Sequence, residues 1–256
     1  MNNIFQTKRF GLLLKRQWLD FGRIYLISLL VVAGILSLFY FLNLKSDFDK
    51  PSSYALSFRV PLFSISGIIF LSIIASNYFA QMGQKSRAAI ELLLPASITE
   101  KFLAGVFFTA ILSLLSYLLI FYIVDMAFVS ALRKAVIDNA AERFPHFFND
   151  FDHVFKSLYA MPFLISSIFL LGSIAFNRFH YIKTLIITMI VTGVWAFVVV
   201  KAGAWLFEGR VPLEGYNHSS ALNSKDMAEW LSLALVVFFT LFFWTIAYLR
   251  LKEKEV

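Results

Sequence analysis

Six long apolar stretches constrain the fold of this chain more than any other feature of its sequence. Each is about as long as the roughly 20 residues that an α-helix needs to cross a hydrocarbon core. Their apolar residues run all round the helix, as expected of helices that contact lipid and satisfy their own backbone groups. The predicted spans are residues 24–42, 60–80, 102–124, 158–176, 184–205 and 229–249.

The composition leaves little room for anything besides membrane helices. The chain of 256 residues is 59% hydrophobic and 15% charged, so no soluble catalytic domain fits beside the spans. The absence of cysteine excludes disulfides, thiolate nucleophiles and cysteine-ligated metals. The chain has no P-loop motif for ATP, and its histidines are scattered without a zinc-binding pattern. We therefore expect neither enzymatic activity nor a cofactor.

These observations predict an all-α, polytopic membrane protein with six transmembrane helices and an N-terminal amphipathic helix that lies in the membrane interface. Residues 1–23 would form this elbow helix, residues 24–249 the transmembrane domain, and residues 250–256 a cytoplasmic tail. Lysine and arginine are denser in both tails and in the second and fourth loops, which places both termini in the cytoplasm. The net charge of +7 is assigned to anionic lipid headgroups, not to nucleic acid.

The N-terminal segment combines a basic face with an aromatic anchor. Basic residues recur at a seven-residue interval, and apolar residues line the opposite side. The elbow residues that carry this pattern are Lys8, Arg9, Lys15, Arg16 and Trp18. Two alternatives stay open for this helix: a passive interfacial anchor, or an elbow that contacts a cytoplasmic partner.

A short polar insert, residues 81–101, follows the second span. Pro95 ends a short amphipathic stretch, because the residue before a proline disfavours helical angles. Ser97 and Glu100 have the spacing of a capping box, so a new helix should begin at Ile98 and continue into the third span. The insert predicts a compact projection on the cytoplasmic face, although an ordinary capped turn has the same local pattern.

The insert, the six spans and the basic leader together resemble permease subunits of the type-2 ABC transporter family. In that family a Leu-Pro-x-Ser stretch followed by charged residues contacts the ATP-binding subunit, and this chain reads Leu-Pro-Ala-Ser at residues 94–97. The resemblance implies a coupling loop that contacts an ATPase through Glu91, Leu93, Leu94, Pro95, Ser97, Glu100 and Lys101.

The resemblance also implies partners and a location. It predicts a separate ABC-type ATP-binding subunit, a homodimer or heterodimer of permeases, and the cytoplasmic (inner) membrane of a bacterium. Two features depart from the family pattern: no second signature is found nearer the C-terminus, and the outer loop, residues 125–157, is long.

Ionisable residues are missing from the centres of the predicted spans, which argues against a carrier driven by protons or sodium ions. Asp125 and Lys201 lie near the outer ends of their spans and are expected at the interface. A permease with such spans would export a hydrophobic or amphipathic substrate. The alternative function is a non-transporting membrane scaffold, or a partner of an envelope or secretion complex. Its docking surface would be the Phe-rich outer loop, in which we expect one or two short helices.

Overall fold

The structure, a computed structural model, describes residues 6–45, 56–79, 96–135, 144–148, 156–176, 178–207 and 218–255. The regular secondary structure of these residues is helical throughout. The elements are α1 (Thr7–Leu44), α2 (Arg59–Tyr78), α4 (Ile98–Val106), the π-helical stretch η2 (Phe107–Leu112), α5 (Ser113–Ala135), α7 (Lys156–Ala175), α8 (His180–Phe207) and α9 (His218–Glu255).

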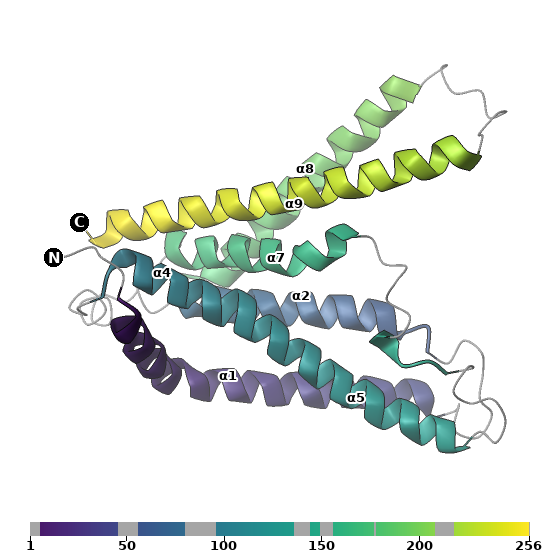
Figure 1. Ribbon diagram of the computed structural model, residues 1–256, viewed down its shortest axis with the longest axis horizontal. Coiled ribbons are helices and arrows are strands. Elements are labelled where there is room, and N and C mark those ends of the chain that lie inside the picture. The colour runs from purple at the N-terminus through teal and green to yellow at the C-terminus, as the bar shows by residue number, and fades with distance from the viewer. Residues whose placement is uncertain are drawn as a thin grey trace.

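Most of these helices run along the long axis of the molecule and form one bundle (Figure 1). α2 packs against α1 and α5 and also against α7, and α7 in turn packs against α9. α8 contacts α7 and α2 but then diverges from the other helices (Figure 1). The beginning of α1 and the end of α9 lie at the same end of the bundle.

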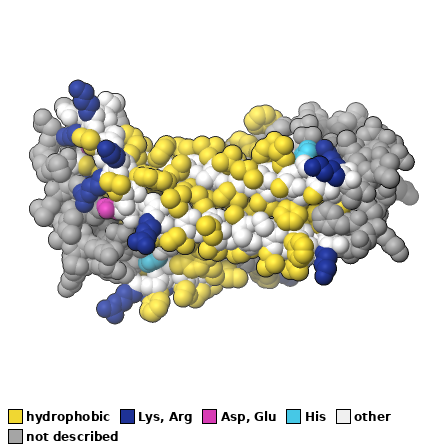
Figure 2. All heavy atoms as spheres, turned by 90° about the horizontal axis from the view of Figure 1, so that it is seen from below, with side chains coloured by type: hydrophobic (Ala, Val, Ile, Leu, Met, Phe, Trp, Pro, Cys, Tyr) yellow, Lys and Arg dark blue, Asp and Glu magenta, His cyan; other side chains and the backbone are white. Residues whose placement is uncertain are grey.

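The helices confirm the architecture of a multi-pass membrane protein at the level of length and composition. A shorter apolar helix, Tyr159–Ala175, lies within α7, where the fourth span was predicted. On the face drawn in Figure 2, hydrophobic side chains cover the middle while lysine and arginine gather toward both ends, as in chains that cross a bilayer. The five described helices that are long and apolar enough to span are Thr7–Leu44, Arg59–Tyr78, Ile98–Lys134, His180–Ala202 and Glu229–Glu253.

The predicted elbow and the first span belong to a single helix. α1 comprises 38 residues, and its N-terminal part is inclined to the remainder (Figure 1). At 1.5 Å per residue it measures about 57 Å, well beyond a hydrocarbon core of about 30 Å. One end of α1 therefore extends out of the hydrocarbon region, and an interfacial position for residues 7–23 stays a prediction.

The third predicted span contains a π-helical stretch. α4, η2 and α5 follow one another without a break, and α5 continues to Ala135, beyond the predicted end of the span at residue 124. A π stretch displaces backbone carbonyls from their usual partners. Tyr25 of α1 donates its hydroxyl to the carbonyl of Leu112 at 3.1 Å, and Ser116 donates to the same carbonyl at 2.8 Å. α1 thus supports the irregular turn.

An aromatic core fills the space between α1, α2 and α5. Tyr40, Phe70, Tyr117 and Phe121 are each 2% exposed or less. The rings of Tyr40 and Phe121 meet edge-on with centroids 6.2 Å apart, and those of Phe70 and Tyr117 are stacked with centroids 6.0 Å apart. Gly67 lets α2 approach the ring of Tyr117 on α5, because a Cβ atom at this position would lie 3.0 Å from that ring.

Candidate functional site: two carboxylates on the third helix

Two buried carboxylates organise polar contacts at opposite ends of the third helix. Glu100 lies in the first turn of α4 and is 0% exposed; Asp125 lies in α5 and is 1% exposed. They are the acidic side chains of residues 98–135. Burying a carboxylate is costly unless it is paired and hydrogen-bonded, so the partners of each show which segments it holds together.

Glu100 caps the N-termini of two helices at once. Its Oε1 atom accepts a hydrogen bond from the backbone N–H of Gln6 at 2.9 Å, and its Oε2 atom accepts one from the N–H of Ser97 at 2.9 Å. Gln6 precedes α1 and Ser97 precedes α4, so the positive ends of two helix dipoles face one carboxylate. Arg9 adds an ion pair, with Nη2 at 3.1 Å from Oε1.

The predicted capping box is confirmed. The hydroxyl of Ser97 accepts from the N–H of Glu100 at 3.2 Å, and α4 begins at Ile98 as predicted. Lys101 is also buried, with 2% of its surface exposed. The remaining predicted residues of the coupling loop lie outside the described residues: Glu91, Leu93, Leu94 and Pro95. Their contact with an ATPase stays a prediction.

Two of the predicted elbow residues contact the bundle. Arg9 pairs with Glu100, and the ring of Trp18 stacks on Phe108 of η2 with centroids 6.3 Å apart. The other basic side chains predicted for the elbow are exposed or half-exposed: Lys8, Lys15 and Arg16. The elbow segment is therefore fastened to the third helix through the Gln6 amide, the Arg9 ion pair and the Trp18 ring, while most of its positive charge stays outside.

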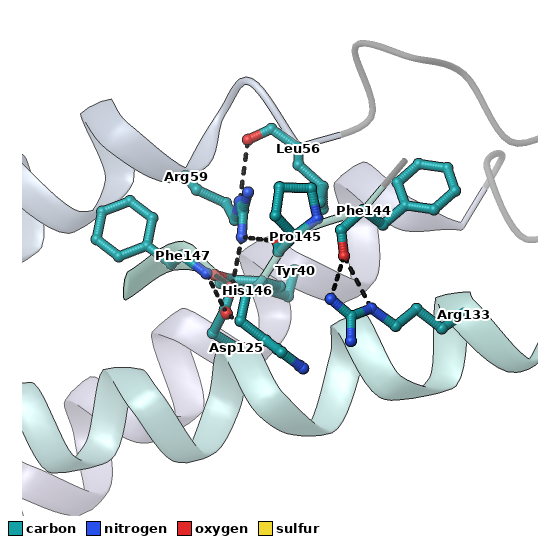
Figure 3. A network of polar contacts seen from close by, with 9 residues as sticks. All are labelled: Tyr40, Leu56, Arg59, Asp125, Arg133, Phe144, Pro145, His146 and Phe147. Carbon is teal, nitrogen blue, oxygen red and sulfur yellow. Dashed lines mark hydrogen bonds and ion pairs between the residues drawn. The ribbon is translucent and has the colours of Figure 1, made fainter. Parts of the chain in front are cut away.

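Asp125 forms a second network at the other end of the third helix (Figure 3). Its Oδ1 atom accepts from the Tyr40 hydroxyl at 2.8 Å and from Arg59 Nη1 at 3.2 Å. Its Oδ2 atom accepts from the N–H of Phe147 at 3.0 Å, and His146 Nδ1 lies 3.8 Å from it. One carboxylate thus joins α1, α2, α5 and a short segment that follows α5.

The interfacial depth expected for Asp125 stays a prediction, and the network adds what surrounds its side chain. The carboxylate is enclosed by protein, and Arg59, which precedes the second predicted span, is its buried counterion at 6% exposed. The pair is 66 residues apart in sequence, so no local pattern announces it. One signal was present: Tyr117, Phe121 and Asp125 repeat at four-residue spacing, which places them on one helix face.

Hydroxyl groups connect the helices between these two ends. Ser66 of α2 contacts the Tyr117 hydroxyl at 2.7 Å, and Ser76 of α2 contacts His180 Nδ1 of α8 at 2.8 Å. Interhelical hydrogen bonds of this kind hold bundles together in lipid. Within the described ranges, His, Cys, Asp and Glu side chains do not cluster in threes or more to hold a metal ion.

Comparisons with protein-family models, with curated proteins and with solved structures give no significant match.

Proposed function

We propose that this chain is the membrane-spanning permease subunit of an ABC transporter of the type-2 family, driven by a separate ATP-binding subunit. It would reside in the bacterial inner membrane with both termini in the cytoplasm, and pair with a second permease. The five apolar helices that are long enough to span support a membrane subunit, and α1 and α9 begin and end on one side of the bundle.

The double cap at Glu100 is the observation that carries the proposal. A permease must pass the movement of its ATPase to its spans, and this requires a stiff connection between the cytoplasmic segments and the third helix. Glu100 supplies such a connection, because one buried carboxylate binds the start of α1 and the start of α4. The insert of residues 81–101, which resembles the family's coupling segment, includes Glu100 itself.

α7, the fourth predicted span in chain order, would raise the number of spans from five to six. It has 20 residues, which at 1.5 Å per residue gives about 30 Å, the thickness of a hydrocarbon core. α7 also packs against both α2 and α9, so it needs less apolar surface toward lipid than the outer helices do. Six spans agree with termini on one side of the membrane.

The substrate would be hydrophobic or amphipathic, and the direction export. Arg59 and Asp125 form an ion pair near one end of the spans, so they neutralise each other. Hydroxyl groups and aromatic rings supply the polarity between the two ends, which suits a lipid-like or peptide cargo better than an ion.

Co-purification from the native membrane tests the proposal. The chain would be solubilised in mild detergent and its companions identified by mass spectrometry, with Leu94→Asp as the test variant. Leu213→Asp, in the loop expected on the opposite side, is the matched control. An ATPase that accompanies the natural chain and the control, but is lost from Leu94→Asp while that variant still inserts, supports the proposal.

A second pair of variants tests the double cap itself. Glu100→Gln keeps the size of the side chain but removes the charge and one acceptor, so it should weaken the complex with the ATPase. Glu253→Gln, an exposed carboxylate in α9, should leave the complex intact. No ATPase in any sample would overturn the proposal and favour the membrane scaffold, whose partner would then be sought on residues 125–157.

A further inference from the structure

Residues 144–148 are docked beside Asp125, near the end of α1, the start of α2 and the second half of α5 (Figure 3). Two phenylalanines anchor this segment: Phe144 is 1% exposed and Phe147 is 6% exposed. The ring centroid of Phe147 lies 5.0 Å from that of Phe63 and 4.9 Å from that of Phe121. The segment therefore completes the aromatic core at this end.

Helix side chains hold the segment through its backbone. Arg133 near the end of α5 donates two hydrogen bonds to the carbonyl of Phe144, from Nε at 2.8 Å and from Nη2 at 2.6 Å. Arg59 donates to the next carbonyl of the segment at 3.0 Å, and Asp125 accepts from an amide of the segment. The segment is therefore held in the way that a bound peptide is held, by hydrogen bonds between side chains of the helices and its own backbone.

The buried charges of the helices stay paired without the segment. Arg59 and Asp125 form an ion pair at 3.2 Å, and Tyr40 donates to the same carboxylate. Arg59 Nε has a further acceptor in the carbonyl of Leu56 at 3.3 Å. Removing the segment would expose apolar rings and peptide groups and would take away the hydrogen bonds that Arg133 and Asp125 Oδ2 make to it. The Arg59–Asp125 ion pair and the Tyr40 hydrogen bond would stay in place, so release would not leave either member of the buried pair without its counterion.

We propose that residues 144–148 form a reversible strap, which ties the ends of α1, α2 and α5 together when docked and lets these ends separate when released. The strap is formed by contacts within this chain, so this proposal does not depend on whether the chain has an ATPase partner. Its two aromatic anchors supply the binding, and Arg133 is the residue that holds the strap without taking part in the Arg59–Asp125 pair.

The natural chain contains no cysteine, so a single introduced thiol reports on release. Val129→Cys is close to isosteric and lies between Asp125 and Arg133 on one face of α5, at 0% exposed. Its reaction with a maleimide would be followed in the detergent-solubilised full chain. Release is provoked in two ways, by Arg133→Met and by Phe147→Ala. Lys134→Met is the matched control, because it removes one positive charge at the neighbouring, exposed position.

The thiol should react slowly in the otherwise natural chain and in the Lys134→Met control. It should react about tenfold faster or more in Arg133→Met and Phe147→Ala, since hydrogen bonds from a charged donor are worth at least this factor. Equal rates in all four proteins would overturn the proposal, because the segment would then be a permanent part of the core.

A distance measurement tests whether the strap restrains the helices. Spin labels at Lys45→Cys and Lys134→Cys report the separation of the ends of α1 and α5, both at exposed positions. Adding Arg133→Met should broaden the distance distribution and shift it to longer values. Faster thiol labelling with an unchanged distribution would overturn the proposed restraint on the helix ends. Gel filtration and helical circular dichroism would establish that each variant is folded.

Discussion

α8 and the third helix are almost equally apolar, yet the protein surrounds one and scarcely touches the other. The most apolar windows of the two helices have mean hydropathies of 2.2 and 2.3, but 0% of the α8 window is buried against 39% for the third helix. In the third helix the apolar side chains fill a core with α1 and α2. In α8 they face outward, where lipid would take the place of water. Hydropathy thus reports suitability for a membrane, while packing depends on small residues and polar partners.

The largest loss of stability should come from breaking the Arg59–Asp125 pair, which lies in the packed region around the third helix. Asp125→Leu leaves the Arg59 guanidinium buried without its counterion, which should lower the free energy of unfolding by about 3–5 kcal/mol. Thermal unfolding in detergent would measure the loss. The double variant Arg59→Met with Asp125→Leu should recover a large part of it, and a double variant as unstable as the single one would contradict the assignment.

The same substitution, made once in the core that packs on the third helix and once on α8, compares the packing of the two regions directly. Ile74→Ala, in the core of α2 at 1% exposed, should lower the free energy of unfolding by about 2–5 kcal/mol because it opens a cavity. Ile190→Ala, on α8 at 60% exposed, should change it by less than about 0.5 kcal/mol, as at other surface sites. Unfolding midpoints in one detergent give both values, and equal losses would mean that α8 is packed against protein.

Two glycines compare a packed and an open position along α8: Gly172 of α7 faces α8, and Gly193 lies in α8 away from that contact. A Cβ atom at Gly172 would overlap the side chain of Thr184, so Gly172→Ala should cost about 1–3 kcal/mol through overpacking. Gly193, farther along α8, has nothing within 4 Å of a Cβ atom, and Gly193→Ala should be neutral or stabilising. Thr184→Ala should relieve part of the Gly172→Ala effect; no relief would place the clash elsewhere.

The smallest expected effect is a gain at the turn between α7 and α8. Phe179 has φ 53°, in the left-handed region that disfavours a bulky residue, and its side chain is 71% exposed. Phe179→Gly should therefore raise the free energy of unfolding by about 1 kcal/mol. Unfolding midpoints would show the gain, with Phe179→Ala as a control that keeps the strain. A loss in the glycine variant would indicate that the ring itself contributes to packing.

What depends on neighbours in sequence could be predicted, and what depends on folding could not. The helix start at Ile98 follows from Ser97 and Glu100, three residues apart, and the structure has this capping box. The second partner of Glu100, the amide of Gln6, lies 94 residues away in sequence and depends on how α1 meets α4. The same holds for Arg59 and Asp125, which look like ordinary loop and interface charges until three helices enclose them.

Hydropathy also has a limit in this chain. It predicted where long apolar helices lie, because length and hydropathy are local properties. It did not distinguish α7, which packs between α2 and α9, from α8, which lies largely exposed. Burial of α7 is accompanied by hydroxyls that bond to their own helix, such as Ser166 and Ser173, and small residues of this kind were the available signal.

The third helix, which contains the π-helical stretch η2, is held at both ends and so acts as a spacer of fixed length. Glu100 binds the start of α1 and Asp125 binds Tyr40 near its end, so both carboxylates must face the same neighbouring helix. Each residue of an α-helix turns the chain by about 100°, and η2, whose wider i→i+5 turns hold more residues, lowers the rotation per residue between the two carboxylates. Inserting or deleting one residue between them would turn Asp125 out of phase with Glu100. The number of residues between Glu100 and Asp125 therefore decides whether the contacts at both ends of the bundle can form together. The chemistry of the individual side chains does not reveal this requirement.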